Sequence, residues 1–487
     1  NPENCIQCNR CSYVCPHAVI RPVALTEEEA ANAPQTLEMT GLKQYKFAIA
    51  VSALDCTGCG SCVNVCPGKK GAKALAMENM EANIEMQKFF DYSVTLPEKE
   101  DVIAKFKENT VKGSQFKQPL LEFSGACAGC GETPYAKLIT QLFGDRMYIA
   151  NATGCSSIWG NSSPSTPYTV NAKGQGPAWD NSLFEDNAEF GYGMLLAQKA
   201  IREGLKAKVE AVAANEKASE EVKAACQEWL DTYTVGATNG AATDKLVAAL
   251  EGIDCDVCKD IVKNKDFLAK KSQWIFGGDG WAYDIGFGGV DHVLASGKDI
   301  NIMVFDTEVY SNTGGQSSKS TPTGAIAQFA AGGKEVKKKD MASIAMSYGY
   351  VYVAQISMGA DFNQTVKAIA EAEAYPGPSL IIAYAPCINH GIKKGMSKAQ
   401  TEEELAVKCG YWHNFRFNPE AESKFTLDSK APTEDYQAFL DGEVRYNSLK
   451  RSNPEKAARL FALNEEQAKA RYEYLNKLVT LYGKTEE

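Results

Sequence analysis

The chain has 487 residues, a formal net charge of −10, and 44% hydrophobic and 23% charged residues. This length exceeds one core of about 150 residues, so we expect more than one domain. The negative charge argues against nucleic acid or an anionic membrane as the main partner. No apolar run approaches the ~18 residues that cross a bilayer. We find no signal peptide, so we expect a cytoplasmic protein without a membrane partner.

The N-terminal part contains two runs of four cysteines, NPENCIQCNRCSYVCP and DCTGCGSCVNVCP, both with the spacing CxxCxxCxxxCP. In this spacing, three thiolates of each run bind one 4Fe–4S cluster and the fourth binds the other cluster. Zinc is the alternative, but zinc usually takes two CxxC pairs. We predict two clusters, one held by Cys5, Cys8, Cys11 and Cys66, the other by Cys56, Cys59, Cys62 and Cys15.

The insert between the two cysteine runs contains an acidic stretch with a helical pattern, TEEEAAN, and YKFAIAV, which we predict to be a strand. After a polar stretch at residues 107–123, the pattern changes to apolar strands that alternate with helices. This pattern predicts a mostly parallel, doubly wound sheet that helices cover on both faces. The predicted strands lie within residues 146–154, 272–280, 300–308, 349–357 and 378–387.

Chemically distinctive residues follow the ends of these strands. Cys155, Asp279, Thr307 and Cys387 each lie at or just after a strand end. Since ligands bind beyond the carboxyl ends of parallel strands, we expect these residues to line one edge of the sheet.

A third four-cysteine site is expected at the same edge. The motif GACAGCGETPY supplies Cys127 and Cys130, and Cys155 and Cys387 complete the set. Zinc binding, or burial of Cys155 and Cys387 as small residues, are the alternatives. A charged helical insertion at about residues 200–271 contains another CxxC, Cys255 and Cys258, which we predict not to bind metal.

The segment GGDGWAYDIG, followed by DTEVYSNTGGQ, is typical of a thiamine diphosphate site. Glycines let the backbone approach the diphosphate closely, and Mg²⁺ prefers oxygen ligands. Asp279 would supply a carboxylate, and Thr307 and Val309 a hydroxyl and a carbonyl. The alternative is an ordinary GDG turn in another α/β enzyme.

These motifs, together with ATGCSSIWG and APCINHG, resemble those of single-chain pyruvate:ferredoxin oxidoreductases, in the same order. The resemblance implies that the third cysteine set holds a 4Fe–4S cluster beside thiamine diphosphate. It further implies cofactor contacts and a substrate-facing asparagine, and assigns these roles to Glu132, Cys155, Gly278, Asp279, Gly280, Trp281, Thr307, Val309 and Asn312. An N-cap at Thr133 with Pro134 at the first helical position would also explain the sequence after Glu132 without catalysis.

The implied reaction is the oxidative decarboxylation of pyruvate with coenzyme A to acetyl-CoA and CO₂. Electrons would pass singly through three 4Fe–4S clusters to ferredoxin or flavodoxin. The resemblance also implies Mg²⁺, a homodimer and further N-terminal domains of the same enzyme. A relative with another 2-oxoacid substrate, and an electron-relay subunit without catalysis of its own, remain alternatives.

These motifs predict the domain order. We expect a ferredoxin-like domain at residues 1–118, a thiamine diphosphate-binding domain at 119–417 and a helical C-terminal extension at 418–487. None of the four histidines lies in a nucleophile or metal motif, so we predict polar or packing roles for His17, His292, His390 and His413.

Overall fold

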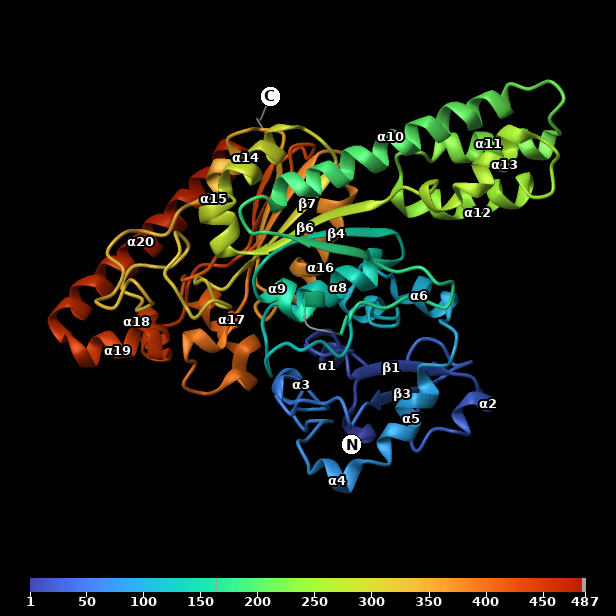
Figure 1. Cartoon of the computed structure of the whole chain (residues 1–487). Helices are drawn as coiled ribbons and strands as arrows, with labels where there is room; N and C mark the ends of the chain where they lie inside the picture. The colour runs from blue at the N-terminus through green and yellow to red at the C-terminus, as the bar shows by residue number, and fades with distance from the viewer. Residues whose placement is uncertain (163–164, 484–487) are drawn as a thin grey trace.

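The computed structural model describes residues 1–162 and 165–483. In Figure 1, an N-terminal module in blue lies below a large central sheet, and a helical arm projects from the sheet to one side. We call residues 1–118 the N-terminal module, the region around the large sheet the sheet domain, and residues 187–268 the helical arm.

The N-terminal module is a small three-stranded antiparallel sheet with short helices. Strand β1 (Ile20–Leu25) pairs with β3 (Lys46–Val51), which also pairs with β2 (Leu37–Glu38). The expected acidic helix in the insert is α2 (Glu27–Ala30), and the expected strand is β3. The other helices of the module are α1 (Arg10–Tyr13), α3 (Ser61–Val65), α4 (Met80–Asn83), α5 (Met86–Ser93), α6 (Glu100–Phe106) and α7 (Val111–Ser114).

The central sheet has eight strands in the order β11-β10-β8-β9-β7-β6-β4-β5. All five predicted strands are present and parallel, and the predicted α/β fold class is confirmed. Their bounds are β4 (Met147–Ala152), β6 (Ser272–Gly278), β7 (Ile300–Asp306), β8 (Tyr352–Ile356) and β9 (Pro378–Tyr384). The sequence did not indicate β5 (Ala178–Ser182), β10 (Phe415–Phe417) or β11 (Phe425–Leu427), which lie at the two edges.

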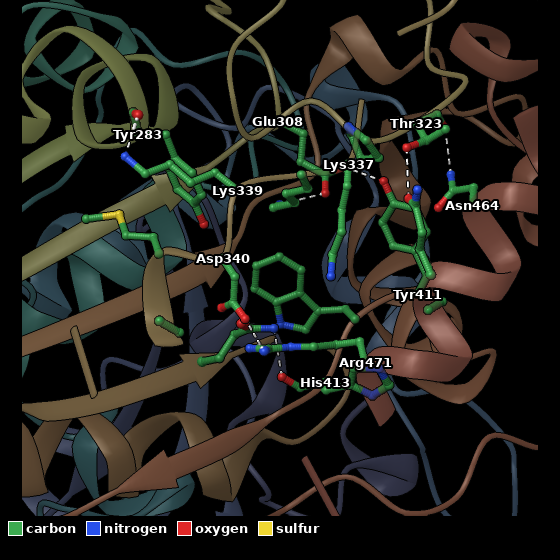
Figure 2. Close-up of a pocket in the computed structure, with 18 of the residues that line it drawn as sticks. Tyr283, Glu308, Thr323, Lys337, Lys339, Asp340, Tyr411, His413, Asn464 and Arg471 are labelled. Carbon is green, nitrogen blue, oxygen red and sulfur yellow. Dashed lines mark hydrogen bonds and ion pairs between the residues drawn. The ribbon is translucent and has the colours of Figure 1, made fainter. Parts of the chain in front are cut away.

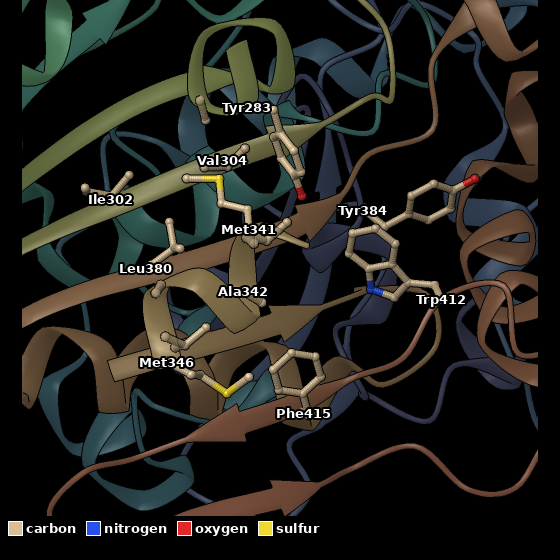
Figure 3. Packing of buried hydrophobic residues seen from close by; sticks show 14 of the residues in the cluster. Tyr283, Ile302, Val304, Met341, Ala342, Met346, Leu380, Tyr384, Trp412 and Phe415 are labelled. Carbon is tan, nitrogen blue, oxygen red and sulfur yellow. The ribbon is translucent and has the colours of Figure 1, made fainter. Parts of the chain in front are cut away.

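Helices cover both faces of this sheet, and alternation along β7 shows why. Ile302 and Val304 join a buried cluster on one face, where Met341 and Leu380 also pack (Figure 3). Met303 and Phe305 point to the other face, into a second large cluster. The first cluster includes residues of α14 (Phe287–Ala295) and α15 (Met341–Met346), and the second those of α8 (Thr133–Phe143) and α16 (Phe362–Ala374).

The predicted insertion is the helical arm, which begins earlier than expected because α10 starts at Asn187. The arm contains α10 (Asn187–Ala213), α11 (Glu220–Asp231), α12 (Gly236–Leu250) and α13 (Asp256–Lys263). The C-terminal part contains α17 (Ala399–Lys408), α18 (Tyr436–Asp441), α19 (Val444–Ser452) and α20 (Pro454–Leu481). Strand β11 lies within the predicted extension and pairs with β10, and residues 484–487 of that extension lie outside the described residues.

The N-terminal module contacts the sheet domain through α1 and α3. The Tyr13 hydroxyl donates to the carbonyl of Phe362 at 3.1 Å, and Lys137 Nζ donates to the carbonyl of Ser12. Asn64 Nδ2 donates to the carbonyl of Ser397 at 2.7 Å. Both cysteine runs therefore lie close to the sheet domain. Over residues 1–162 and 165–483, no helix is long and apolar enough to cross a membrane.

Candidate active site

Four neighbouring parallel strands, β9, β7, β6 and β4, end at one edge of the sheet. Cys155 starts the short helix α9 (Cys155–Ser157) after β4, and Asp279 follows β6. Asp306 is the last residue of β7, and Cys387 lies after β9. The structure therefore brings the predicted strand-end residues to one edge, as parallel pairing requires.

Three oxygen atoms converge between the ends of β6 and β7. Thr307 Oγ1 lies 3.0 Å from Asp279 Oδ1 and 3.0 Å from the carbonyl oxygen of Val309. All three residues are buried. A carboxylate, a hydroxyl and a carbonyl are the oxygen donors that Mg²⁺ accepts alongside phosphate oxygens. The donor set at these positions therefore fits the predicted magnesium site.

The backbone of the GDG turn leaves room for a ligand at one glycine only. A Cβ at Gly278 would meet nothing closer than the Phe305 carbonyl oxygen at 3.8 Å. A Cβ at Gly280 would lie 2.3 Å from the Tyr310 ring, so that glycine is needed for packing. Trp281 is buried, and its ring packs against Gly277. The open backbone at Gly278 fits close approach of a diphosphate.

A buried ion network supports the loop after β7. Glu308 has a φ of 60°, a left-handed conformation that is uncommon for a residue with a side chain. Its carboxylate lies 2.9 Å from Lys338 Nζ and 2.8 Å from Arg445. Burial alone would raise the pKa of Glu308, but the Lys338 and Arg445 cations outweigh it and lower the pKa to about 2. The fixed charge of Glu308 thus holds the backbone between Thr307 and Val309 in place.

This network borders a polar cavity of about 120 Å³. Glu308, Asp340 and Arg471 are among the residues that line it (Figure 2). Lys338 also lines the cavity, and its Nζ lies 2.9 Å from Asp306 Oδ2. One lysine therefore neutralises carboxylates on both sides of Thr307. The sequence alone did not mark Lys338, since it is the middle residue of a run of three lysines.

Glu132 lies near the thiols of the third cysteine set, because its charge acts on Cys130, Cys155 and Cys387. The Glu132 carboxylate accepts a hydrogen bond of 2.7 Å from Trp159 Nε1, and burial raises its pKa to about 7. Burial and then the Glu132 charge raise the pKa of the Cys130 and Cys155 thiols. Glu132 itself occupies the N-cap position of α8, but its side chain makes no capping bond. The helix start thus does not account for this carboxylate.

The four cysteines of the third set are mutual neighbours. Cys127, Cys130 and Cys387 all raise the pKa of Cys155, after burial and Glu132. Thiols that disfavour one another's charge fit a common cationic cluster to which all four would bind.

The cysteines of the module also group as the spacing predicts. Burial and then Cys15, Cys59 and Cys56 raise the pKa of Cys62 to about 12. Burial and then the nearby Cys8 and Cys66 likewise raise the pKa of Cys5. The fourth cysteine of each run therefore lies with the first three of the other run. The cluster assignments themselves remain predictions.

Hydrogen bonds connect the candidate magnesium donors, the oxygen atoms of Asp279, Thr307 and Val309, to the third cysteine set. Ser311 Oγ lies 2.5 Å from Thr307 Oγ1, and the Ser311 side chain also hydrogen-bonds to the Cys387 thiol. Asn389 Nδ2 lies 3.6 Å from Cys387 Sγ and donates to the Ser311 carbonyl. Asn312, predicted to face the substrate, lies on the exposed turn that follows.

Sequence reasoning missed several supporting residues. Ser318 Oγ donates to Asp279 Oδ2 at 2.5 Å, and Ser320 Oγ donates to Asp306 Oδ1 at 2.5 Å. The ring of His390 is 2.7 Å from the Thr307 carbonyl, and burial lowers its pKa to about 3. A neutral, buried His390 matches the predicted polar or packing role. The polar run SSKS was the only sequence signal for the two serines.

Two family models match the chain. Residues 4–70 match the 4Fe-4S dicluster domain, and residues 262–383 match the C-terminal TPP binding domain of thiamine pyrophosphate enzymes. The chain therefore combines an iron–sulfur module with a thiamine pyrophosphate-binding domain, as the motifs predicted.

Individual relatives indicate which thiamine pyrophosphate enzymes the chain resembles. The chain is 56% identical over 488 residues to a pyruvate-flavodoxin oxidoreductase of Klebsiella pneumoniae, a match that covers 98% of this chain and 41% of that protein. It is 56% identical over 505 residues to the pyruvate:ferredoxin oxidoreductase of Moorella thermoacetica, with 98% and 42% covered. A mitochondrial pyruvate dehydrogenase [NADP(+)] of Euglena gracilis is 47% identical over 489 residues, with 98% and 27% covered.

The predicted resemblance to pyruvate:ferredoxin and pyruvate-flavodoxin oxidoreductases is thus confirmed over nearly the whole chain. The chain spans about two fifths of the length of the first two relatives.

Proposed function

We propose that this chain carries the thiamine diphosphate site and the electron path of a pyruvate:ferredoxin or pyruvate-flavodoxin oxidoreductase. The reaction is the oxidative decarboxylation of pyruvate with coenzyme A to acetyl-CoA and CO₂. The three cysteine sets would hold three 4Fe–4S clusters, which would supply single-electron transfer toward ferredoxin or flavodoxin. Bound thiamine diphosphate supplies the electron sink for decarboxylation.

The observation that carries this proposal is the hydrogen-bonded connection from Asp279 through Thr307 and Ser311 to Cys387. This connection joins the candidate magnesium donors to the third cysteine set, and no helix or strand lies between them. A cofactor that releases electrons and a cluster that accepts them must lie this close for direct transfer. An electron-relay subunit without catalysis would need no such oxygen set.

The roles of the residues follow from their positions. Asp279, Thr307 and Val309 would hold Mg²⁺ and through it the diphosphate, while Gly278 leaves the backbone open to the phosphates. The Glu308–Lys338 pair keeps this loop in its left-handed conformation. Glu132, fixed by Trp159, would contact the cofactor from the side of the thiols.

The electron path would continue along α8. This helix starts just after Cys130, and its Lys137 donates to the carbonyl of Ser12, between Cys11 and Cys15. A cluster on the third cysteine set would therefore be joined to the module clusters through one buried helix. The homodimer and the further domains of the enzyme belong to this proposal.

The test is an anaerobic assay of the iron- and thiamine-loaded protein with a panel of 2-oxoacids, with and without coenzyme A. Oxidised ferredoxin and flavodoxin serve as acceptors, and NADP⁺ as a third, because one relative carries that name. The assay uses the chain alone and together with the remaining polypeptide of a relative. Coenzyme A-dependent reduction with pyruvate supports the proposal, and activity only with another 2-oxoacid changes the substrate. Full cofactor content with no activity in either preparation would favour the electron-relay subunit.

A further inference from the structure

The helical arm has a hydrophobic core of its own, separate from the sheet. Trp229, Cys226, Leu246 and Ile261 are fully buried in it. Figure 1 shows α11, α12 and α13 at the end of the arm, away from the N-terminal module. The arm therefore contributes no residue to the site described above, yet three cysteines lie within it.

Cys255 and Cys258 form a CxxC at the start of α13. Cys255 is the N-cap residue, and its Sγ accepts a hydrogen bond of 3.4 Å from the backbone N–H of Cys258. The Cys258 thiol also hydrogen-bonds to Cys255. Cys258 is buried, with 4% of its surface exposed, whereas Cys255 is partly exposed. Residues three apart at a helix start are neighbours on one face of the helix, with Cβ atoms about 5–6 Å apart. A disulfide requires about 3.5–4.5 Å between the Cβ atoms, so the first turn of α13 would close slightly when the bond forms.

The surroundings make the two thiols chemically unequal. The hydrogen bonds from Cys258 lower the pKa of Cys255, although Asp256 opposes this shift. Burial and the bond to Cys255 raise the pKa of Cys258 to about 11. Lys259 is occupied by Asp254 at 2.5 Å, so the hydrogen bonds and not a free cation favour the Cys255 thiolate. An accessible attacking thiol beside a buried second thiol is the arrangement of dithiol exchange sites.

We propose that Cys255 and Cys258 form a thiol–disulfide exchange site on the helical arm, with Cys255 as the attacking thiol. The Cys255 thiolate attacks one sulfur of an incoming disulfide, and that disulfide releases one thiol. Cys258 then gives up its proton and attacks Cys255 Sγ, which releases the second thiol. The pair loses two electrons and two protons, and the incoming disulfide gains them.

A purely structural role is the competing explanation, because a thiol can serve as a helix cap. The two explanations separate in Cys255→Ser. Serine is a good N-cap, so the substitution keeps α13 and the melting temperature while it removes exchange.

The experiment uses the full chain with its clusters assembled, under anaerobic conditions, so that cluster ligands are protected. Glutathione disulfide is the probe in one arm of the experiment and oxidised thioredoxin in the other, to separate small-molecule from protein disulfides. Differential alkylation with mass spectrometry reads the state of every free thiol. We expect a Cys255–Cys258 disulfide in at least one arm, formed about tenfold or more faster than any oxidation of the buried Cys409.

Variants make the outcome decisive. In Cys258→Ala the reaction should stop at a mixed disulfide on Cys255. Cys409→Ala, the control at a buried thiol outside the arm, should exchange like the original chain. In Cys258→Ser a hydroxyl donor remains, so alkylation of Cys255 should stay faster than in Cys258→Ala. The proposal is overturned if both thiols stay reduced in both arms, if Cys258→Ala gives no mixed disulfide, or if Cys255→Ser unfolds the arm.

Discussion

The sheet domain and the N-terminal module are stabilised in different ways. Two large clusters of buried residues cover both faces of the central sheet. The module has three small clusters with five, four and three buried residues. The smallest consists of Cys15, Val19 and Ile20, with Cys11 and Cys62 packed against it.

This difference indicates that the cysteines of the module are part of its core. A module with so little apolar burial cannot offset its conformational entropy without further links. Cluster coordination by these cysteines would supply those links, so we expect metal binding and folding of the module to be coupled. The sheet domain has a core of ordinary size, and its ligand site lies at the edge of that core.

Removal of iron should therefore produce the largest difference in stability between the module and the sheet domain. With a strong iron chelator under reducing conditions, we expect the module to unfold while the sheet domain stays folded. Limited proteolysis should cut within residues 1–118 and leave a resistant fragment that begins near residue 119. The control is a magnesium chelator alone, which should leave both parts intact. Loss of the whole fold at once, or a protease-resistant iron-free module, would contradict the claim that the module alone depends on iron for its fold.

The sequence predicted the parts whose chemistry or periodicity is local. Cysteine spacing indicated the module, and apolar runs located all five central strands because buried parallel strands are apolar throughout. Placement of Asp279, Thr307 and Cys387 at one edge followed from parallel topology alone.

Other features depend on partners distant in sequence. β5 reads AWDNS and is largely polar, because an edge strand needs no apolar face. Lys338 becomes part of the site only because the fold brings it to Asp306 and Glu308. The alternative explanation that placed the N-cap at Thr133 was wrong by one residue, because Glu132 takes that position while its side chain hydrogen-bonds to Trp159.

Lys338→Met should have the next largest effect, and only on the sheet domain. It leaves the buried Asp306 and Glu308 carboxylates without their shared cation, which typically costs about 3–5 kcal/mol. We expect a lower free energy of unfolding for the sheet domain and weaker magnesium binding. Lys337→Met is the matched control, because Lys337 is exposed. Denaturant unfolding followed by tryptophan fluorescence measures the free energy of unfolding of both variants. Equal losses of stability in the two variants would contradict the role of the network.

Glu403→Gln should change the pH dependence of the sheet domain. The Glu403 carboxylate accepts from the Gly359 N–H at 2.6 Å and from Tyr135 at 3.2 Å, and burial raises its pKa from 4.5 to about 8. A raised pKa contributes stability that is present below pH 4.5 and is lost as the pH rises through about 8.

The original chain should thus lose up to about 1.4 kcal/mol of stability per pH unit between these values because of this group. The glutamine variant should lack that slope. Its control is Glu404→Gln, since Glu404 is partly exposed and paired with Lys408. Unfolding free energies measured from pH 5 to pH 8 test this, and an unchanged slope in Glu403→Gln would show that the carboxylate is charged throughout.

Asp279→Asn should have the smallest effect on stability and still abolish most ligand binding. Burial and the nearby Asp306 raise the pKa of Asp279, so its charge opposes folding. Asparagine keeps the shape, so the sheet domain should be at least as stable. Magnesium loses a charged ligand, so we expect binding of thiamine diphosphate with Mg²⁺ to weaken by about 100-fold. Calorimetric titration measures this, with Asp284→Asn in the following helix (Gly280–Ile285) as control. Because stability and binding move in opposite directions, a variant that loses both would show that Asp279 serves the core and not the ligand.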